Sequence, residues 1–404
     1  MELLEVEVPV LLYSSDESDD ADEPCGQEVV TADSSSTAGA HAEGYDVLSK
    51  VSALASRLAM DTSSEAARLP PEILHAEADA AYCVRRVHFS ELSVAAFRQH
   101  VVSRSRAPLI ITGLGDQLPC SEAGLGVDVL QAALPHDFGL PVRGRGVIPA
   151  EAFFAALAAG EQVYLADVSI ARSFPWIHQL FRVPRYFTHC FTHRTRKNLS
   201  IAIDTPALFI GAAGTRSALH IDQMCSNFWM FVGQGYKRWI CFHPDDAYLL
   251  SPTFDEADQI NRFPSVEELS ADIDCAQRMA RARRVELNIG PGELLFIPQG
   301  TPHEVTNLSI TTAVSANFID QSNVEQSIAQ GRAKLMHREE GSERYANLLS
   351  VLNALDEIDW PSFEDDIDVS DHVPRRAEDM FDIFPAHAKV MGMQPITLAA
   401  PTGA

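Results

Sequence analysis

The sequence lacks the cysteine spacing on which small disulfide-bonded proteins and many zinc sites depend. Its seven cysteines are odd in number and scattered along the chain, and no two of them form a Cys-x-x-Cys pair. This pattern argues against a disulfide framework and against a structural zinc site. The cysteine usage instead fits a protein of a reducing compartment.

Long apolar runs and a basic N-terminal segment are also missing. No stretch approaches the roughly 18 consecutive apolar residues of a membrane-spanning helix, and residues 1–7 carry no positive charge of the kind that opens a secretory signal. We therefore expect no membrane association and a location in the cytoplasm or nucleus.

Positive charge is absent from the first part of the chain. Residues 1–49 contain 13 Asp and Glu and no Lys or Arg, and the whole chain has a formal net charge of −25. Such a segment buries too little apolar surface to fold, so residues 1–46 are predicted to be a disordered acidic tail. It either solvates the protein or docks a basic partner.

The overall negative charge also bears on the substrate. Binding to phosphates requires basic patches, so a nucleic-acid substrate is unlikely, although the arginines at 281, 283 and 284 leave a tRNA substrate open. A protein segment that carries Lys or Arg suits the negative electrostatic field of the chain better than a nucleic acid does.

What the sequence does contain, between residues 206 and 318, is a series of short apolar runs separated by glycine-containing turns. This pattern is typical of successive antiparallel strands and predicts a mainly β fold. The predicted strands lie within 206–215, 216–222, 228–235, 236–242, 285–289, 294–298 and 303–308.

Two of these runs carry the residues of a metal site. His220 and Asp222 stand two apart in a strand, so their side chains point to one face, and His303 opens a later strand. Two imidazoles and one carboxylate are the ligands of non-haem Fe(II) oxygenases, and they leave three positions for cosubstrate and oxygen. A second His-x-Asp pair, His243 and Asp245, opens a Pro/Asp-rich loop and is interpreted as an exposed strand exit.

Together these residues resemble the JmjC-domain, cupin-like Fe(II)/2-oxoglutarate dioxygenases, and most closely the phosphatidylserine-receptor-type protein hydroxylases. The similarity covers about residues 80 to 320, and residues 183–187 also match. The motifs are residues 107–113, Gly214-Thr215, His220-x-Asp222, residues 235–239, residues 292–298, His303, Asn307-Leu308 and Asn317-Phe318. The resemblance implies a double-stranded β-helix of the jelly-roll or cupin type with flanking helices, and Fe(II), 2-oxoglutarate and O2 as cofactors.

The resemblance also assigns the cosubstrate site. Lys237, fifteen residues after Asp222, would bind the far carboxylate of 2-oxoglutarate, and Ser315, twelve residues after His303, would assist it. Asn317 lies on the same strand face as Ser315 and would contact cosubstrate or substrate.

The sequence departs from the family at two positions. Met230 stands where the family has asparagine, and the family's tyrosine falls at Ile170, with Tyr164 on the same predicted strand.

The rest of the chain frames this domain. Residues 47–80 are predicted to be a helical lead-in, residues 81–320 the catalytic domain and residues 321–404 a helical and acidic extension, with a further helix over 151–159. The extension carries a leucine stripe that either packs on its own domain or forms a homodimer. The stripe consists of Leu348, Leu349, Leu352 and Leu355.

The predicted function is hydroxylation of a protein side chain coupled to conversion of 2-oxoglutarate to succinate. Three groups of alternatives remain open: an N-methyl demethylase or tRNA hydroxylase of the same family, a cupin enzyme that does not use 2-oxoglutarate, and a non-catalytic interaction module. The absence of a Cys/His zinc reader makes a chromatin demethylase the weaker candidate within the family.

Overall fold

The computed structural model describes residues 82–101, 106–115, 125–170, 206–358 and 381–382, together with residues 174, 177, 181, 183–187, 190 and 191. The acidic tail, the whole helical lead-in over 47–80 and nearly all of the chain after residue 358 lie outside the described residues. Predictions for these segments stay predictions.

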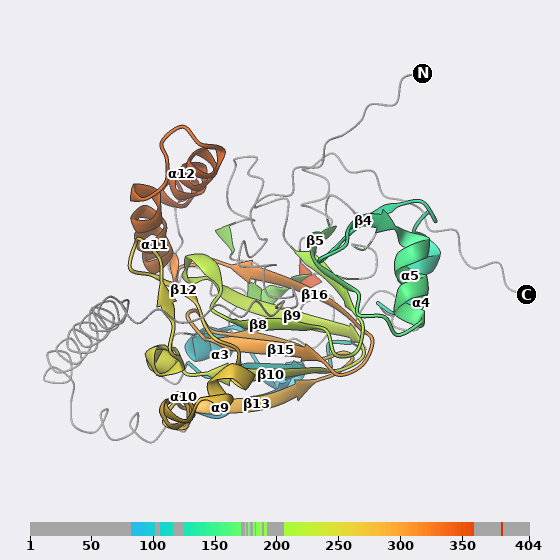
Figure 1. Cartoon of the computed structure of the whole chain (residues 1–404), viewed down its shortest axis with the longest axis horizontal. Coiled ribbons are helices and arrows are strands. Elements are labelled where there is room, and N and C mark those ends of the chain that lie inside the picture. Colours follow the sequence, from blue (N-terminus) through green and yellow to red (C-terminus); the bar gives the residue numbers. More distant parts are fainter. Residues whose placement is uncertain are drawn as a thin grey trace, which may run out of the picture. The chain divides into compact units, whose positions relative to one another are not determined.

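Two sheets form the body of the described structure (Figure 1). The larger has the order β1-β2-β14-β9-β16-β7-β5 and the smaller has the order β13-β10-β15-β8. In the larger sheet the strands are β1 Arg85–His88, β2 Leu109–Thr112, β14 Leu294–Ile297, β9 Asn227–Gln234, β16 Thr311–Phe318, β7 Ala207–Gly211 and β5 Tyr164–Ser169. In the smaller sheet they are β13 Arg284–Ile289, β10 Lys237–Phe242, β15 His303–Asn307 and β8 Arg216–His220. The predicted double-stranded β-helix is confirmed.

Three short strand pairs and the helices complete the described elements. The pairs are β3 Gly139–Val142 with β4 Gly146–Pro149, β11 Thr253–Phe254 with β12 Ile260–Arg262, and β6 Val183–Pro184 with β17 Phe381–Asp382. The α-helices are α3 Val94–Val101, α4 Val127–Ala133, α5 Ala150–Ala158, α9 Val266–Ala271, α10 Ile273–Met279, α11 Val324–Met336 and α12 Glu343–Asp356. The 3₁₀ turns are η1 Phe89–Glu91, η4 Arg185–Phe187, η5 Gln223–Cys225 and η6 Pro244–Leu250.

The turn from β9 to β10 sets the register of the two sheets. Gly235 has φ +77, and a Cβ at this position would lie 2.0 Å from the carbonyl oxygen of Ile310. Only glycine combines this backbone conformation with so close an approach. The turn therefore starts β10 with Lys237 facing the inside of the barrel.

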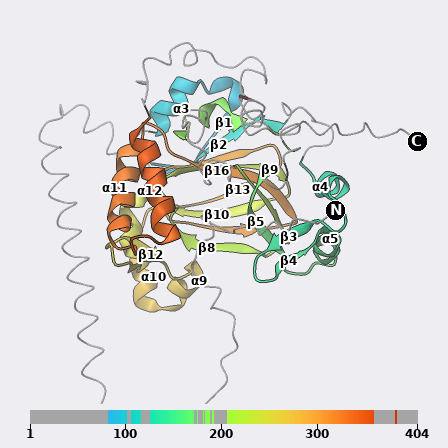
Figure 2. The ribbon, with the colours of Figure 1, turned by 90° about the horizontal axis from the view of Figure 1, so that it is seen from above.

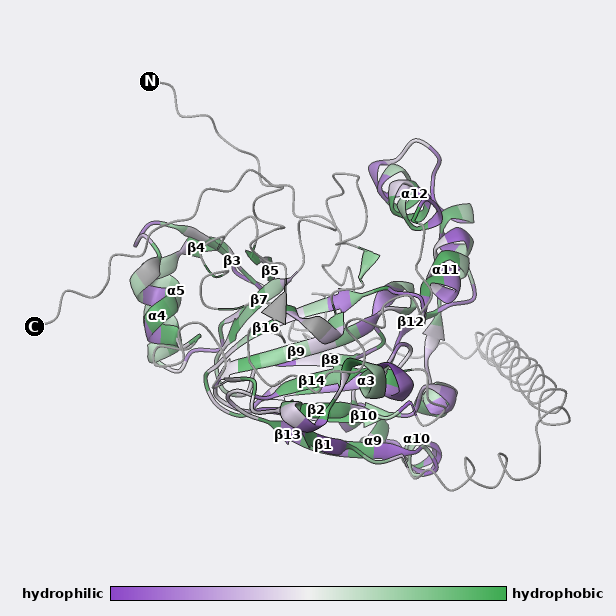
Figure 3. Cartoon of the chain, turned by 180° about the vertical axis from the view of Figure 1, so that it is seen from behind, coloured by the Kyte–Doolittle hydropathy of each residue, from purple (hydrophilic) through white to green (hydrophobic). Residues whose placement is uncertain are grey.

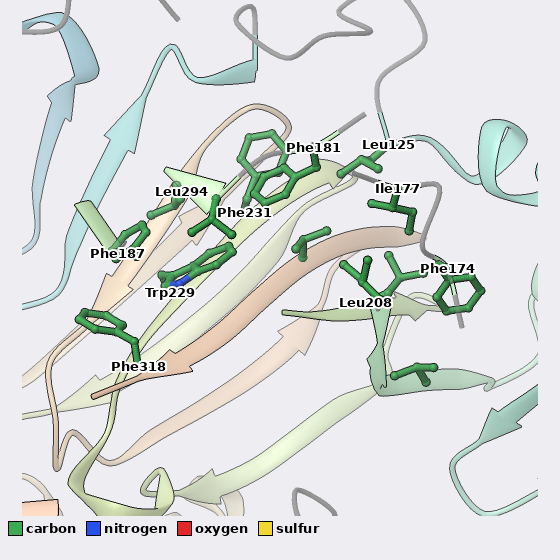
Figure 4. Close-up of a cluster of buried hydrophobic side chains, with 14 of the residues drawn as sticks. Leu125, Phe174, Ile177, Phe181, Phe187, Leu208, Trp229, Phe231, Leu294 and Phe318 are labelled. Atoms are coloured by element: carbon green, nitrogen blue, oxygen red, sulfur yellow. The ribbon is translucent and has the colours of Figure 1, made fainter. Parts of the chain in front are cut away.

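Apolar side chains fill both faces of the larger sheet. The inner face packs Met230 and Leu295 against Trp239 of the smaller sheet. The outer face packs Trp229 against Phe181 and Phe187, whose rings stack on it (Figure 4). Strands covered on both faces are mostly apolar, as Figure 3 shows for β14 and for the middle of β9. Trp229 and Trp239 are therefore both buried in the barrel walls.

Helices stand at the two ends of the strands. In Figure 2, α11 and α12 lie side by side at one end, and α4 and α5 lie at the other. The helix predicted over 151–159 is α5, and Gly341 lies in the short connection between α11 and α12. Leu348, Leu352 and Leu355 are buried in the chain's own core, and Leu349 is half-buried. A homodimer through this stripe stays a prediction, but three of its four leucines are already covered.

One prediction about exposure was wrong. β10 ends at Phe242 as expected, yet His243 is only 2% exposed because it packs edge-on against Tyr82 and its Nδ1 accepts from the backbone N–H of Asp245. Burial lowers the pKa of His243. Asp245 itself is 61% exposed.

Among the described helices, none has the length and apolar composition to cross a bilayer.

Candidate metal and cosubstrate site

The structure brings His220, Asp222 and His303 together at one end of the barrel. His220 ends β8, Asp222 follows two residues later, and His303 begins β15 directly opposite His220. One ligand atom from each of the three residues lies within 4.8 Å of the others. His303 is buried, whereas the side chains of His220 and Asp222 are 35% and 14% exposed. The site is therefore held by the fold on one side and reached by solvent on the other.

Backbone carbonyls orient both imidazoles. His220 Nδ1 donates to the carbonyl oxygen of Ala218 at 2.7 Å, and His303 Nδ1 donates to that of Thr301 at 3.0 Å. Each contact places the ring proton on Nδ1 and leaves Nε2 as a free ligand atom. The two Nε2 atoms are thus prepared to bind a cation.

The electrostatics of the three residues favour a bound cation at neutral pH. Burial, helped by neighbouring His220, lowers the pKa of His303 to about 4, so its ring is neutral near pH 7. His220 Nε2 lies 3.7 Å from Asp222 Oδ1, close enough for both atoms to reach one ion. Two imidazoles that present Nε2 and one carboxylate, with an open side, fit Fe(II).

Cys225 follows Asp222 closely but does not belong to this set. It is half-buried, and burial raises the pKa of its thiol. A neutral, partly buried thiol is a small packing residue.

Lys237 lies further inside the barrel on β10 and is fully buried. Its Nζ donates to Asn307 Oδ1 at 2.7 Å and lies 5.8 Å from the centre of the Tyr164 ring. Both partners are neutral, so no carboxylate offsets the burial of the ammonium group. Burial therefore lowers the pKa of Lys237 to about 7. A buried ammonium with neutral partners is costly, and a bound anion would relieve that cost.

Asn307 is a functional candidate that the sequence motif contained but to which no role was assigned. Its Oδ1 accepts from Lys237, and its Nδ2 donates to Thr215 Oγ1 at 2.8 Å. Gly211 makes room for it, because a Cβ there would lie 2.2 Å from Asn307 Nδ2. Strand alternation was the available signal, since Asn307 is four residues from His303 and shares its inner face.

The two other predicted cosubstrate residues lie on the inner face of β16 at different depths. Ser315 is buried and lies opposite Met230 in the pairing of β16 with β9. Asn317 is nearer the triad, where its Nδ2 donates to Ser226 Oγ at 2.8 Å. Their contacts with a cosubstrate stay predictions.

Of the two positions considered for the family's tyrosine, Tyr164 is the one beside the lysine. Ile170 lies one residue beyond β5 and is buried in the outer core. Tyr164 is buried on the inner face, and its hydroxyl bonds to Ser217. The ring near Lys237 Nζ is therefore that of Tyr164, and the alignment of the family's tyrosine with Ile170 stays a prediction.

Comparison with known proteins identifies the kind of domain and several relatives. A family model described as "Cupin-like domain" matches residues 147–323. The Caenorhabditis briggsae protein named bifunctional arginine demethylase and lysyl-hydroxylase psr-1 is 24% identical over 318 residues, which cover 70% of this chain and 74% of that protein.

Two further relatives match over shorter segments. HSPB1-associated protein 1 of Mus musculus is 31% identical over 113 residues, 28% of this chain and 23% of that protein. The Homo sapiens protein named 2-oxoglutarate and iron-dependent oxygenase JMJD4 is 26% identical over 165 residues, 40% of this chain and 38% of that protein. The match thus spans under a quarter of the mouse relative. With the motifs, the fold and these relatives together, the chain carries a cupin-like domain of the JmjC kind.

Proposed function

We propose that this protein is an Fe(II)- and 2-oxoglutarate-dependent oxygenase that hydroxylates a side chain of a protein substrate. His220, Asp222 and His303 would hold the metal, and Lys237 would bind the far carboxylate of the cosubstrate. The observation that carries the proposal is the fully buried Lys237, whose hydrogen-bond partner is a neutral amide, on the same inner wall as the triad.

The chain's own residues have separate roles in binding the metal and the cosubstrate. When bound, Fe(II) and 2-oxoglutarate supply oxidation by O2, in which decarboxylation to succinate and CO2 is coupled to insertion of one oxygen atom into a substrate C–H bond. Ala218 and Thr301 keep the Nδ1 protons in place, so both imidazoles present Nε2. Lys237 contributes a charge-assisted hydrogen bond, and Asn307 fixes the direction of its ammonium group.

A protein segment rich in Lys or Arg is the substrate class that the chain's charge favours, because the formal net charge is −25. The relative psr-1 is named for both arginine demethylation and lysyl hydroxylation, so demethylation stays the second candidate. Met230, at the position of the family's asparagine, is the feature that favours a non-catalytic module, whereas the buried lysine and the intact triad favour an enzyme.

The test is succinate formation from 2-oxoglutarate by purified protein with Fe(II), O2 and ascorbate, beside Asp222→Ala and Lys237→Met. We expect both variants to lose succinate formation. Asp245→Ala is the matched control, since Asp245 belongs to the other His-x-Asp pair and is 61% exposed. Succinate formation should survive in this control.

The alternatives predict different results. Oxidation of a substrate without 2-oxoglutarate would favour a cupin enzyme of another kind. Failure of the metal-loaded protein to bind 2-oxoglutarate would sink the proposal and leave the interaction module. Once succinate formation is established, mass spectrometry of basic peptides distinguishes a gain of one oxygen atom from loss of a methyl group.

A further inference from the structure

The turn that follows Asp222 has an unusual backbone. Met224 has φ 57 and Cys225 has φ 46, so two successive residues with side chains lie in the left-handed region. This conformation is disfavoured for residues other than glycine and persists only where surrounding contacts impose it. Asp222 immediately precedes this turn, so whatever imposes the turn also directs the carboxylate.

The first of these contacts comes from helix α11. Met224 is 9% exposed and its side chain lies over Gly331, in the middle of α11. A Cβ at Gly331 would lie 2.8 Å from Met224 Cε and 2.7 Å from Leu352 Cδ2 of α12. The absence of a side chain at Gly331 thus creates a notch that receives Met224 from one side and Leu352 from the other.

The second contact is made by Asn323, immediately before α11. Its side chain is fully buried, and Nδ2 donates to the carbonyl oxygen of Cys225 at 2.9 Å and to that of Phe318 at 3.2 Å. Its Oδ1 accepts from the backbone N–H of Asp320 at 2.8 Å. One amide therefore ties the strained turn to the end of β16.

The third contact joins the same two segments. Ser226 closes the turn by donating from Oγ to the carbonyl oxygen of Gln223 at 2.9 Å, and Asn317 of β16 donates to Ser226 Oγ at 2.8 Å. The turn is thus held from both the strand side and the helix side.

We propose that α11 is a positioning element of the metal centre: Met224 seated at Gly331, and Asn323 holding Cys225, fix the turn that orients the Asp222 carboxylate. This inference rests on the proposed metal site. The start of the C-terminal extension then supports the metal centre of the barrel domain, and Met224, Asn323 and Gly331 are positioning residues.

The test is titration of the metal-free full chain with Co(II), followed by its d–d absorption and by competition with a chelator. Groups that orient metal ligands typically change affinity about 10- to 100-fold when removed. We expect Met224→Ala and Asn323→Ala each to weaken Co(II) binding about ten-fold and to shift the absorption bands. Met224→Leu keeps the apolar contact and should bind Co(II) like the natural chain.

Two further variants separate positioning from general stability. Gly331→Ala improves helix propensity but pushes on Met224, so we expect an unimpaired unfolding midpoint together with Co(II) affinity lowered a few-fold. Leu348→Ala removes buried side-chain volume from α12, where the Leu348 side chain is 8% exposed in the natural chain. It should lower the unfolding midpoint and leave the Co(II) affinity unchanged.

The outcomes distinguish this inference from the proposed function. If Met224→Ala and Asn323→Ala both bind Co(II) as tightly as the natural chain, the positioning role is overturned while the metal site stands. The same conclusion follows if Leu348→Ala loses as much Co(II) affinity as these two variants do. If Asp222→Ala binds Co(II) as tightly as the natural chain, or the natural chain binds none, the metal site and the positioning role fall together.

Discussion

The two ends of the inner barrel wall hold their polar groups in different ways. Around Lys237 the groups are buried and pair with neutral side chains: Lys237 and Asn307 lie on regular strands, and Thr215 directly precedes β8. Around the triad, the His220 side chain is 35% exposed and the turn after Asp222 is in left-handed backbone. One end is closed and regular, and the other is open and strained.

This difference indicates how the site is used. Because Lys237 is fully buried, we expect a dicarboxylate to enter from the triad end and reach the ammonium last. The closed end then sets cosubstrate affinity, and the open end sets metal affinity and access for a protein substrate. Variants at the closed end should therefore change 2-oxoglutarate binding without changing metal binding.

The largest effect is expected for Lys237→Met. Removing one partner of a buried hydrogen-bonded charge pair costs about 2 to 5 kcal/mol, or roughly 30-fold to several thousand-fold in affinity. We expect this loss in 2-oxoglutarate binding, measured by calorimetry on Mn(II)-loaded protein, with Mn(II) affinity unchanged. Arg238→Met is the control, since Arg238 is the next residue and its side chain is 42% exposed. Unchanged 2-oxoglutarate affinity in Lys237→Met would remove the lysine from the cosubstrate site.

The next effect is a pH dependence of 2-oxoglutarate affinity. Burial lowers the pKa of Lys237 to about 7, while a bound dianion favours its charged form. Above pH 7 binding must therefore take up a proton, and affinity should fall about ten-fold per pH unit. His303, with a pKa of about 4, is already neutral in this range.

Two controls sharpen the pH experiment. Lys237→Arg keeps its charge at all these pH values, so its affinity should stay flat with pH. In the ligand-free protein, the quantity that changes with pH is the free energy of unfolding, and its change has the opposite sign. The unfolded chain holds the lysine proton up to its usual pKa of 10.5 while the folded chain loses it near 7, so the free energy of unfolding should rise with pH across this window. A flat affinity profile in the natural chain would contradict the prediction.

A smaller effect, on stability, is expected for Gly211→Ala. The added Cβ would lie 2.2 Å from Asn307 Nδ2 and 2.8 Å from Thr215 Oγ1. Overpacking of this kind costs about 1 to 3 kcal/mol, measurable by urea unfolding, and it should also weaken 2-oxoglutarate binding through Asn307. Gly160→Ala is the comparison, because Gly160 has φ +77 and no neighbour within 4 Å. It should lose roughly 1 kcal/mol through backbone strain alone and keep its ligand affinity.

The sequence predicted the triad because strand alternation and spacing depend on local residues. His220 and His303 lie on strands whose apolar runs and glycine turns are visible in the sequence, whereas Asp222, expected on the same strand as His220, lies two residues beyond the end of β8. The partner of Lys237 was not predicted because Asn307 meets it only through the pairing of β10 with β15. The burial of His243 was missed for the same reason, since Tyr82, which covers it, is distant in the sequence. Contacts between distant segments depend on register, which local patterns do not fix.

The smallest effect is expected for Tyr164→Phe, and it tests whether the closed end acts through packing or through a hydroxyl. The ring lies 5.8 Å from Lys237 Nζ, and the hydroxyl bonds to Ser217. Phenylalanine keeps the ring and removes only this hydrogen bond, at a cost of about 0.5 to 1.5 kcal/mol in the free energy of unfolding. Affinity for 2-oxoglutarate should then stay within about three-fold of the natural chain, whereas Tyr164→Leu, which also removes the cation–π contact, should weaken it further. A loss above about ten-fold in Tyr164→Phe, or 1.4 kcal/mol, would show instead that the hydroxyl leaves Ser217 and binds the cosubstrate, so that the closed end is rearranged by its ligand.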